Sequence, residues 1–271
     1  MEQVVSPDGT PIAYHRLGKG PPLILVPGSG AANPVAWTDV IPTLEENFTV
    51  YSIDRRGHGE SGDSSRYAIE REFEDIAAVV DSTGEPANLL GHSFGALCAL
   101  EAALLTPNIR KLILYEPAIT LPGVTLYPEG VIDRLQALLD VGDKEAVLTT
   151  LYRDVAMIPA EEIEQLKASP VWPTRLATAH TLPREARAED RYYFDGQRFR
   201  RLQIPTLLLL GSESPSFLKA ATEILDDSLP NSRIAALPGQ QHLAMYTAPQ
   251  LFLETVLPFL LEPGDYLENP S

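Results

Sequence analysis

The chain alternates short apolar runs with longer amphipathic stretches, and this alternation predicts its secondary structure. Continuous apolar runs are typical of buried parallel strands, whereas apolar residues three or four positions apart indicate helices. Residues 3–16 alternate apolar and polar side chains around Pro7-Asp8-Gly9, which predicts a β-hairpin. The expected parallel strands are residues 22–26, 48–53, 88–90, 111–115, 206–210 and 233–237. The expected helices are residues 37–46, 69–80, 94–105, 216–229 and 249–261.

One connection in this alternation is much longer than the others, between the strands at 111–115 and 206–210. Because strands that alternate with helices favour a mostly parallel sheet with helices on both faces, the long segment is expected to be an insertion. We predict a core domain formed by residues 1–116 and 204–271, with residues 117–203 as a helical cap over the end of the sheet. Helical patterns in the insertion lie at residues 131–139, 144–157 and 161–168, divided by Pro159, Pro170, Pro173 and Pro183.

The net charge and the composition of the chain limit which partners it can bind and where in the cell we expect it. Lys and Arg total 21 against 37 Asp and Glu, so the formal net charge is −16 and its field opposes binding to nucleic acid and to anionic membranes. Cys98 is the only cysteine, which excludes an intrachain disulfide and a cysteine-based metal site. We read no signal peptide and no apolar run near the length of a membrane span, and therefore expect a soluble, cytoplasmic protein without a membrane partner.

The candidate nucleophile is Ser93, in the pentapeptide Gly91-His92-Ser93-Phe94-Gly95. This G-x-S-x-G pattern directly follows an apolar strand and opens a helix, so it predicts a sharp turn that exposes the serine at the edge of the sheet. A serine hydroxyl needs a neighbouring base at neutral pH, and an imidazole suits that role. His242, in the loop after the last strand, is the predicted base.

These segments resemble their counterparts in the α/β-hydrolase superfamily: residues 91–95, 27–30, 54–61 and the loop of His242. The resemblance covers nearly the whole chain except the cap. It implies an α/β fold with a mostly parallel eight-stranded sheet, and a catalytic order of serine, acid and histidine. It also implies an oxyanion hole formed by the backbone N–H groups of Phe94 and Ser29. His58 then belongs to a structural turn, and His92 packs beside the nucleophile.

The third catalytic residue departs from the family pattern. Much of the family has an Asp three residues after the glycine that ends the strand at 206–210, where this chain has Ser214. We favour Glu116 as the acid, because haloalkane dehalogenases and zearalenone-type lactone hydrolases carry a Glu at the end of the earlier strand and Tyr-Glu-Pro is similar. Glu213, one residue early, is the second candidate. Asp226, Asp227 or the absence of any acid remain as further alternatives.

These residues predict a serine hydrolase that cleaves a small-molecule carboxylic ester or lactone through an acyl-enzyme intermediate. Ser93 argues against dehalogenases and epoxide hydrolases, whose nucleophile is a carboxylate. The alternatives are a carbon–carbon bond hydrolase of the same fold, or a receptor that binds a ligand in the pocket with little or no turnover. No motif indicates a nucleotide or metal cofactor. Trp172 and Tyr192, with Tyr193 and Phe194, are candidates to contact the substrate, and packing within the cap is the expected role for most of the four. The sequence leaves the oligomeric state and natural substrate open.

Overall fold

The computed structural model describes residues 1–31, 35–121 and 126–262. Within these ranges, eight strands form one sheet in the order β1-β2-β4-β3-β5-β6-β7-β8. The strands β1 and β2 are antiparallel to their neighbours, and the other neighbouring strands run parallel. The strands are β1 (Glu2–Val5), β2 (Pro11–Gly18), β3 (Pro22–Val26), β4 (Thr49–Ile53), β5 (Ala87–His92), β6 (Ile109–Tyr115), β7 (Thr206–Gly211) and β8 (Ser232–Leu237).

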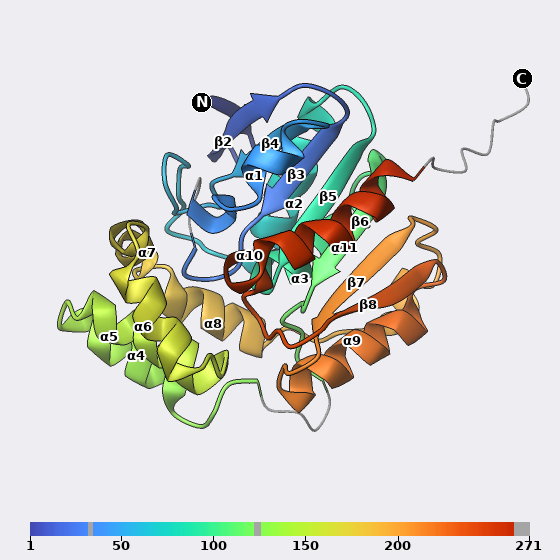
Figure 1. Cartoon of the computed structure of the whole chain (residues 1–271). Coiled ribbons are helices and arrows are strands. Elements are labelled where there is room, and N and C mark those ends of the chain that lie inside the picture. Colours follow the sequence, from blue (N-terminus) through green and yellow to red (C-terminus); the bar gives the residue numbers. More distant parts are fainter. Residues whose placement is uncertain (32–34, 122–125, 263–271) are drawn as a thin grey trace, which may run out of the picture.

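Helices cover both faces of this sheet (Figure 1). One apolar cluster joins the sheet to α2, α3 and α9, and a second joins its other face to α1 and α11. The predicted fold class is therefore confirmed. Within the ranges given above, no helix combines the length and the apolar character needed to cross a membrane. The helices are η1 (Val35–Trp37), α1 (Ile41–Leu44), α2 (Ile69–Ser82), α3 (Phe94–Ala102), α9 (Ser216–Ser228), α10 (Ala244–Thr247) and α11 (Pro249–Leu261).

A further group of helices lies between β6 and β7, and we call α4 through α8 the helical insertion. In Figure 1 the insertion is the green to yellow group set to one side of the sheet. Its side chains form an apolar cluster of their own, which reaches the rest of the molecule at Ala118 and Leu243. Its elements are α4 (Val131–Asp140), α5 (Lys144–Thr150), the π-helix η2 (Leu151–Val155), α6 (Ala160–Ala168), α7 (Trp172–Thr178) and α8 (Leu182–Asp190), followed by the 3₁₀ helix η3 (Gly196–Phe199).

Several predicted helices differ from the observed ones. Pro173 and Pro183, interpreted as helix dividers, lie in the first turns of α7 and α8. A proline is tolerated there because the N–H that it lacks would have no intrahelical acceptor. The helix expected at 37–46 is reduced to η1 and the single turn of α1, and the helix expected at 144–157 changes to π-helix after Thr150.

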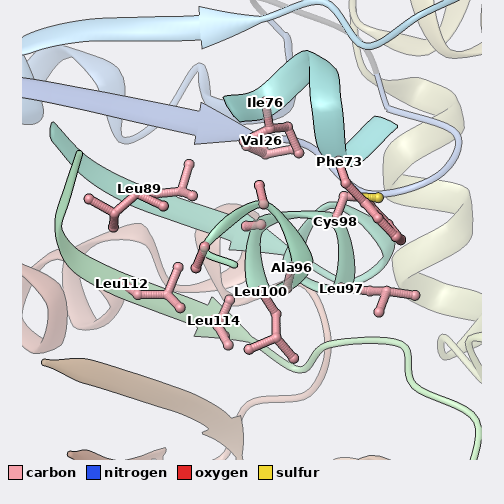
Figure 2. Packing of buried hydrophobic residues seen from close by; sticks show 14 of the residues in the cluster. Val26, Phe73, Ile76, Leu89, Ala96, Leu97, Cys98, Leu100, Leu112 and Leu114 are labelled. Atoms are coloured by element: carbon pink, nitrogen blue, oxygen red, sulfur yellow. The ribbon is translucent and has the colours of Figure 1, made fainter. Parts of the chain in front are cut away.

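The helix that follows the predicted nucleophile is embedded in the core. Every residue of α3 is buried, which explains why its sequence has no polar face. Figure 2 shows Leu100 of α3 beside Leu114 of the sheet, Leu97 on the side of α3 away from the sheet leucines, and Phe73 and Ile76 of α2 nearby. Because α3 is enclosed by the sheet and by α2, its first turn is fixed in place. The residue that precedes it, Ser93, is fixed with it.

Truncation of this helix tests how strongly the packing contributes. We expect Leu100→Ala to lower the free energy of unfolding by about 2–5 kcal/mol, because Leu100 is fully buried and its removal leaves a cavity. The matched control is Leu105→Ala, just beyond the same helix, where the side chain is 54% exposed and the change should stay below about 0.5 kcal/mol. Urea denaturation measures both. Equal effects would contradict the packing described for α3.

Candidate active site

Ser93 occupies a strained turn between β5 and α3. Its backbone φ is 54° and its ψ is −122°, a conformation that costs a non-glycine residue about 1–3 kcal/mol. The flanking glycines allow the tight turn: a Cβ at Gly91 would lie 2.5 Å from the Gly95 carbonyl oxygen, and one at Gly95 would collide with the Pro27 carbonyl. The Ser93 N–H donates to the Tyr115 carbonyl at 2.9 Å. The turn is thereby attached to the neighbouring strand β6.

The side chains of Glu116 and His242 meet at the ends of β6 and β8. The Nδ1 atom of His242 lies 2.6 Å from Oε2 of Glu116. Since an ionised carboxylate only accepts hydrogen bonds, Nδ1 carries the proton and Nε2 is left as the acceptor. Glu116 is fully buried. Its other oxygen, Oε1, accepts from the Gly211 N–H at 2.7 Å and from the Ser214 hydroxyl at 2.5 Å, so three donors compensate its lost hydration.

Ser214 stands where the family usually has an Asp, and here it donates a hydrogen bond to the carboxylate of Glu116. Ser214 is buried and directs its hydroxyl to Glu116. The alternative acid, Glu213, is exposed and accepts from its neighbour Ser212 at 3.1 Å, and Asp226 accepts from Ser232 at 2.6 Å. The structure brings Glu116 together with His242, whereas Glu213 and Asp226 bind other partners.

Two residues beside this pair fix the loop that carries His242. The Tyr115 hydroxyl donates to the Gln241 carbonyl and accepts from the Ala244 N–H at 3.1 Å, so it binds the loop on both sides of the imidazole. The Nε2–H of His92 donates to the His242 carbonyl at 2.8 Å, and burial holds the pKa of His92 well below its usual value. The packing role expected for His92 agrees with these contacts. Sequence analysis missed Tyr115, although it stands next to Glu116.

The glycine-rich loop after β3 runs close to the nucleophile. A Cβ at Gly28 would lie 3.0 Å from Cβ of Ser93, so a larger residue here would crowd the nucleophile. Ser29, in the same loop, borders the same cavity as Ser93. Phe94 lies in the first turn of α3, where backbone N–H groups have no intrahelical acceptor. The loop and this helix terminus therefore face one another across Ser93.

A buried ionic cluster fixes the glycine-rich loop from behind. Arg55 donates to Glu72 and to Glu185 of α8, each at 3.0 Å, and its guanidinium lies 4.8 Å from the ring centre of Phe94. The Ser29 hydroxyl donates to Glu185 at 2.8 Å. Burial alone would raise the pKa of Glu185, but Arg55 holds it below its usual range. The charged form of Glu185 thus joins the insertion, the loop and the core.

His58 contacts the same cluster as a neutral group. Its side chain is buried, and Nδ1 donates to the Arg56 carbonyl at 3.0 Å. Burial, followed by the charge of Arg55, lowers the pKa of His58 to about 4 even though Glu185 lies 3.5 Å away. The structural role expected for His58 agrees with this position, which is behind the glycine-rich loop.

Ser93 and His242 open into one cavity between the sheet and the insertion. Its walls are mainly apolar, and polar side chains of the insertion and its approach also reach it, among them Tyr127, Tyr152, Arg175 and Glu189. Within the described part of the chain, no group of three or more His, Cys, Asp or Glu side chains is placed to hold a metal ion. The apolar wall includes Trp37, Leu126, Leu151, Val155, Ile158 and Phe217.

The structure places the aromatic candidates for substrate contact in packing positions. Trp172 packs into the apolar cluster of the insertion, and the Tyr192 hydroxyl donates to Glu101 of α3 at 2.6 Å. Neither residue is among the described residues that line the cavity. Of the two further aromatic candidates, Tyr193 is exposed and Phe194 stacks on Phe199. An aromatic segment rich in apolar surface packs as readily into a core as around a ligand, and these positions agree with the packing role expected for most of the four residues.

Sequence analysis also missed Arg175. It shares the buried face of α7 with Trp172 and Thr178, at positions three residues apart. That spacing is a signal for a helical face, but it is readable only once the segment is recognised as a helix. The prolines beside it had been interpreted as helix dividers.

Comparison with known proteins places this geometry in a family. The model of the alpha/beta hydrolase family matches residues 23–255. The chain is 28% identical to a putative carbamate hydrolase, RutD, of Azorhizobium caulinodans, over 91% of this chain and 93% of that protein. It is 26% identical to a pimeloyl-[acyl-carrier protein] methyl ester esterase of Aeromonas hydrophila, over 92% and 99%. A crystal structure of an alpha/beta hydrolase from Sphaerobacter thermophilus superposes with a TM-score of 0.84 at 35% identity, covering 96% and 100%.

The low pKa of His58 predicts a pH-dependent contribution to stability. Between about pH 4 and the unfolded value of about 6.5, the unfolded chain binds a proton that the folded chain does not. The free energy of unfolding contributed by neutral His58 is therefore lost as the pH falls through this window. His58→Gln should remove up to about 3 kcal/mol of that loss. Urea denaturation of both proteins at pH 4.5 and 7.5 measures the difference; a difference that does not change with pH contradicts the burial effect.

Proposed function

The chain is an enzyme of the α/β-hydrolase family, and we propose that it hydrolyses small-molecule carboxylic esters or lactones through an acyl-enzyme intermediate on Ser93. The observation that carries this proposal is the contact of 2.6 Å between His242 and the buried Glu116, at the cavity that Ser93 also borders. A base held by a buried carboxylate, at a cavity that a serine also borders, is the arrangement that acyl transfer requires.

In the first half of the reaction, Ser93 Oγ attacks the substrate carbonyl carbon and passes its proton to Nε2 of His242. Glu116 accepts from Nδ1, which fixes the imidazole orientation and stabilises the imidazolium that forms. The backbone N–H groups of Ser29 and Phe94 hold the oxyanion of the tetrahedral intermediate. His242 then returns the proton to the leaving oxygen, which frees an alcohol or opens a lactone ring.

In the second half, His242 takes a proton from water as the water oxygen attacks the acyl carbon. The second tetrahedral intermediate forms against the same N–H groups, and its collapse releases the carboxylic acid and regenerates Ser93. The strained backbone of Ser93 supports this proposal because a positive φ is typical of the elbow that presents a nucleophilic serine to the cavity. No cofactor takes part in these steps.

We assign the helical insertion the role of a cap. Its apolar side chains supply much of the cavity wall opposite Ser93, which suits a substrate with an apolar part beside the scissile carbonyl. The two named relatives, a putative carbamate hydrolase and a methyl ester esterase, act by their names on carbonyl groups that bear a heteroatom leaving group. That shared bond type favours an ester or lactone over a carbon–carbon bond for this chain.

The assigned roles predict a specific pattern of inactive variants with p-nitrophenyl butyrate at neutral pH. Ser93→Ala should lose at least about 10⁴-fold in kcat, and Glu116→Gln about 10³-fold, because the amide cannot stabilise the imidazolium. Glu213→Gln is the matched control and should retain activity, since Glu213 is exposed. Circular dichroism verifies that each variant is folded. Loss of activity in Glu213→Gln but not in Glu116→Gln would reject the proposed acid.

Ser214 provides a graded test of the same carboxylate. Ser214→Ala removes one of the three donors to Glu116 and leaves its contact with His242 in place. We expect kcat to fall about tenfold, because removing a hydrogen bond to a charged group costs about 1.5–3 kcal/mol and only part of this reaches the imidazole. Ser212→Ala, two residues earlier in the same loop, is the control and should be unchanged. An unaltered kcat in Ser214→Ala would show that this support is dispensable.

A further inference from the structure

Arg175 is a buried cation on the wall of the proposed active-site cavity. Its side chain comes from α7 of the insertion and the residue is 2% exposed. One of its nitrogens, Nη1, donates to the Gly30 carbonyl at 3.1 Å and to the Tyr152 hydroxyl at 3.0 Å. The other two, Nε and Nη2, are buried and have no hydrogen-bond partner among the described residues.

No carboxylate neutralises this guanidinium in the described ranges, whereas the other two buried arginines near the site each bind two. Arg55 pairs with Glu72 and Glu185, and Arg56 pairs with Asp8 and Asp75. Arg175 has instead the rings of Tyr152 and Tyr246, with centres 5.9 and 5.1 Å from its guanidinium carbon. The two internal segments outside the described ranges, residues 32–34 and 122–125, contain no acidic residue in their sequence. A buried charge without a partner is costly, so this arrangement favours an anionic ligand.

The two unpartnered nitrogens share one edge of the guanidinium, and the structure contains an example of what that edge binds. In Arg56, Nε and Nη2 each donate at 2.7 Å to one oxygen of the Asp75 carboxylate. Two parallel N–H groups match the two oxygens of a carboxylate, which makes this pairing both strong and specific. The same edge of Arg175 has no hydrogen-bond partner among the described residues, and Arg175 is one of the residues that line the cavity.

The acidic residue on the cavity wall does not oppose an anion at neutral pH. Glu189 is buried, and this burial raises its pKa to about 8 although Tyr127 donates to it at 2.5 Å. Its carboxyl group is therefore mainly protonated at pH 7. The remaining walls are mainly apolar, which strengthens any charge interaction made inside.

We propose that the substrate carries a carboxylate in addition to its scissile ester or lactone, and that Nε and Nη2 of Arg175 bind this carboxylate. The inference rests on the proposed function for the identity of the bond that is cleaved. It assigns Arg175 to specificity: the carboxylate positions the substrate while Ser93 attacks its carbonyl.

The test compares matched acid and neutral substrates. One series is the mono-p-nitrophenyl esters of adipic, pimelic and suberic acid, each paired with its neutral methyl p-nitrophenyl diester. A second series places the carboxylate on the leaving group, as 4-acetoxybenzoate paired with its methyl ester. In at least one series, wild type should favour the acid over the neutral ester at least about tenfold in kcat/KM, and Arg175→Met should lower that ratio about 30-fold. Arg175→Lys should retain part of the preference.

Tyr152→Phe is the matched control, because it removes a donor to the Gly30 carbonyl at 2.8 Å and leaves the charge of Arg175 in place. It should lower kcat for acid and neutral substrates alike and keep their ratio. If Arg175→Met also lowers both equally, Arg175 only positions the loop and the inference is wrong. If wild type hydrolyses activated esters with no preference for the acid in either series, the inference is wrong and the proposed function stands.

A binding experiment separates the two proposals. Monomethyl adipate is titrated calorimetrically into Ser93→Ala and into Ser93→Ala/Arg175→Met, which removes chemistry from the readout. Binding that weakens at least about tenfold without Arg175 supports anion recognition even if no ester is turned over. Equal binding to both variants, or binding to neither together with no acid preference in kcat/KM, overturns it.

Discussion

The contact between Glu116 and His242 joins three strand ends into one arrangement. Glu116 follows β6, His242 follows β8, and the Gly211 amide at the end of the intervening β7 donates to the same carboxylate. A buried carboxylate is stable only where enough donors replace its water, so the three strand ends have to keep their register. The elbow at Ser93 is attached to this unit through the Tyr115 carbonyl. The ends of the sheet strands therefore fix the positions of the His242 imidazole and of Ser93.

The glycine-rich loop, by contrast, depends on the insertion. Glu185 of α8 binds Ser29 and Arg55, while Tyr152 and Arg175 bind the Gly30 carbonyl. Two parts of the insertion thus hold the loop at Ser29 and at Gly30, next to the position where the oxyanion is proposed to form. If the proposed roles hold, these contacts couple substrate selection to oxyanion stabilisation. A change in the insertion that alters specificity is expected to alter kcat as well.

Sequence patterns predicted the fold and much of the proposed site because the signals that mark them lie within short segments of the chain. Apolar runs mark the buried strands, and the glycines around Ser93 mark a turn that other residues cannot adopt. Glu116 was favoured because a strand end fixes where its side chain lies. The helices α7 and α8 were missed because Pro173 and Pro183 initiate helices as well as end them. Arg175, Glu189 and the ionic cluster depend on contacts between segments distant in sequence, which no single-segment pattern contains. The cytoplasmic location stays a prediction.

The contact of 2.5 Å between Ser214 and Glu116 also constrains how such a site can evolve. Positions 116 and 214 approach so closely that two ionised carboxylates there would repel strongly, and one would have to take up a proton. A site that carried carboxylates at both strand ends would therefore have to share a proton between them. The serine at 214 avoids this conflict: it is small enough to leave room for the neighbouring carboxylate, and its hydroxyl donates a hydrogen bond where a second carboxylate would repel.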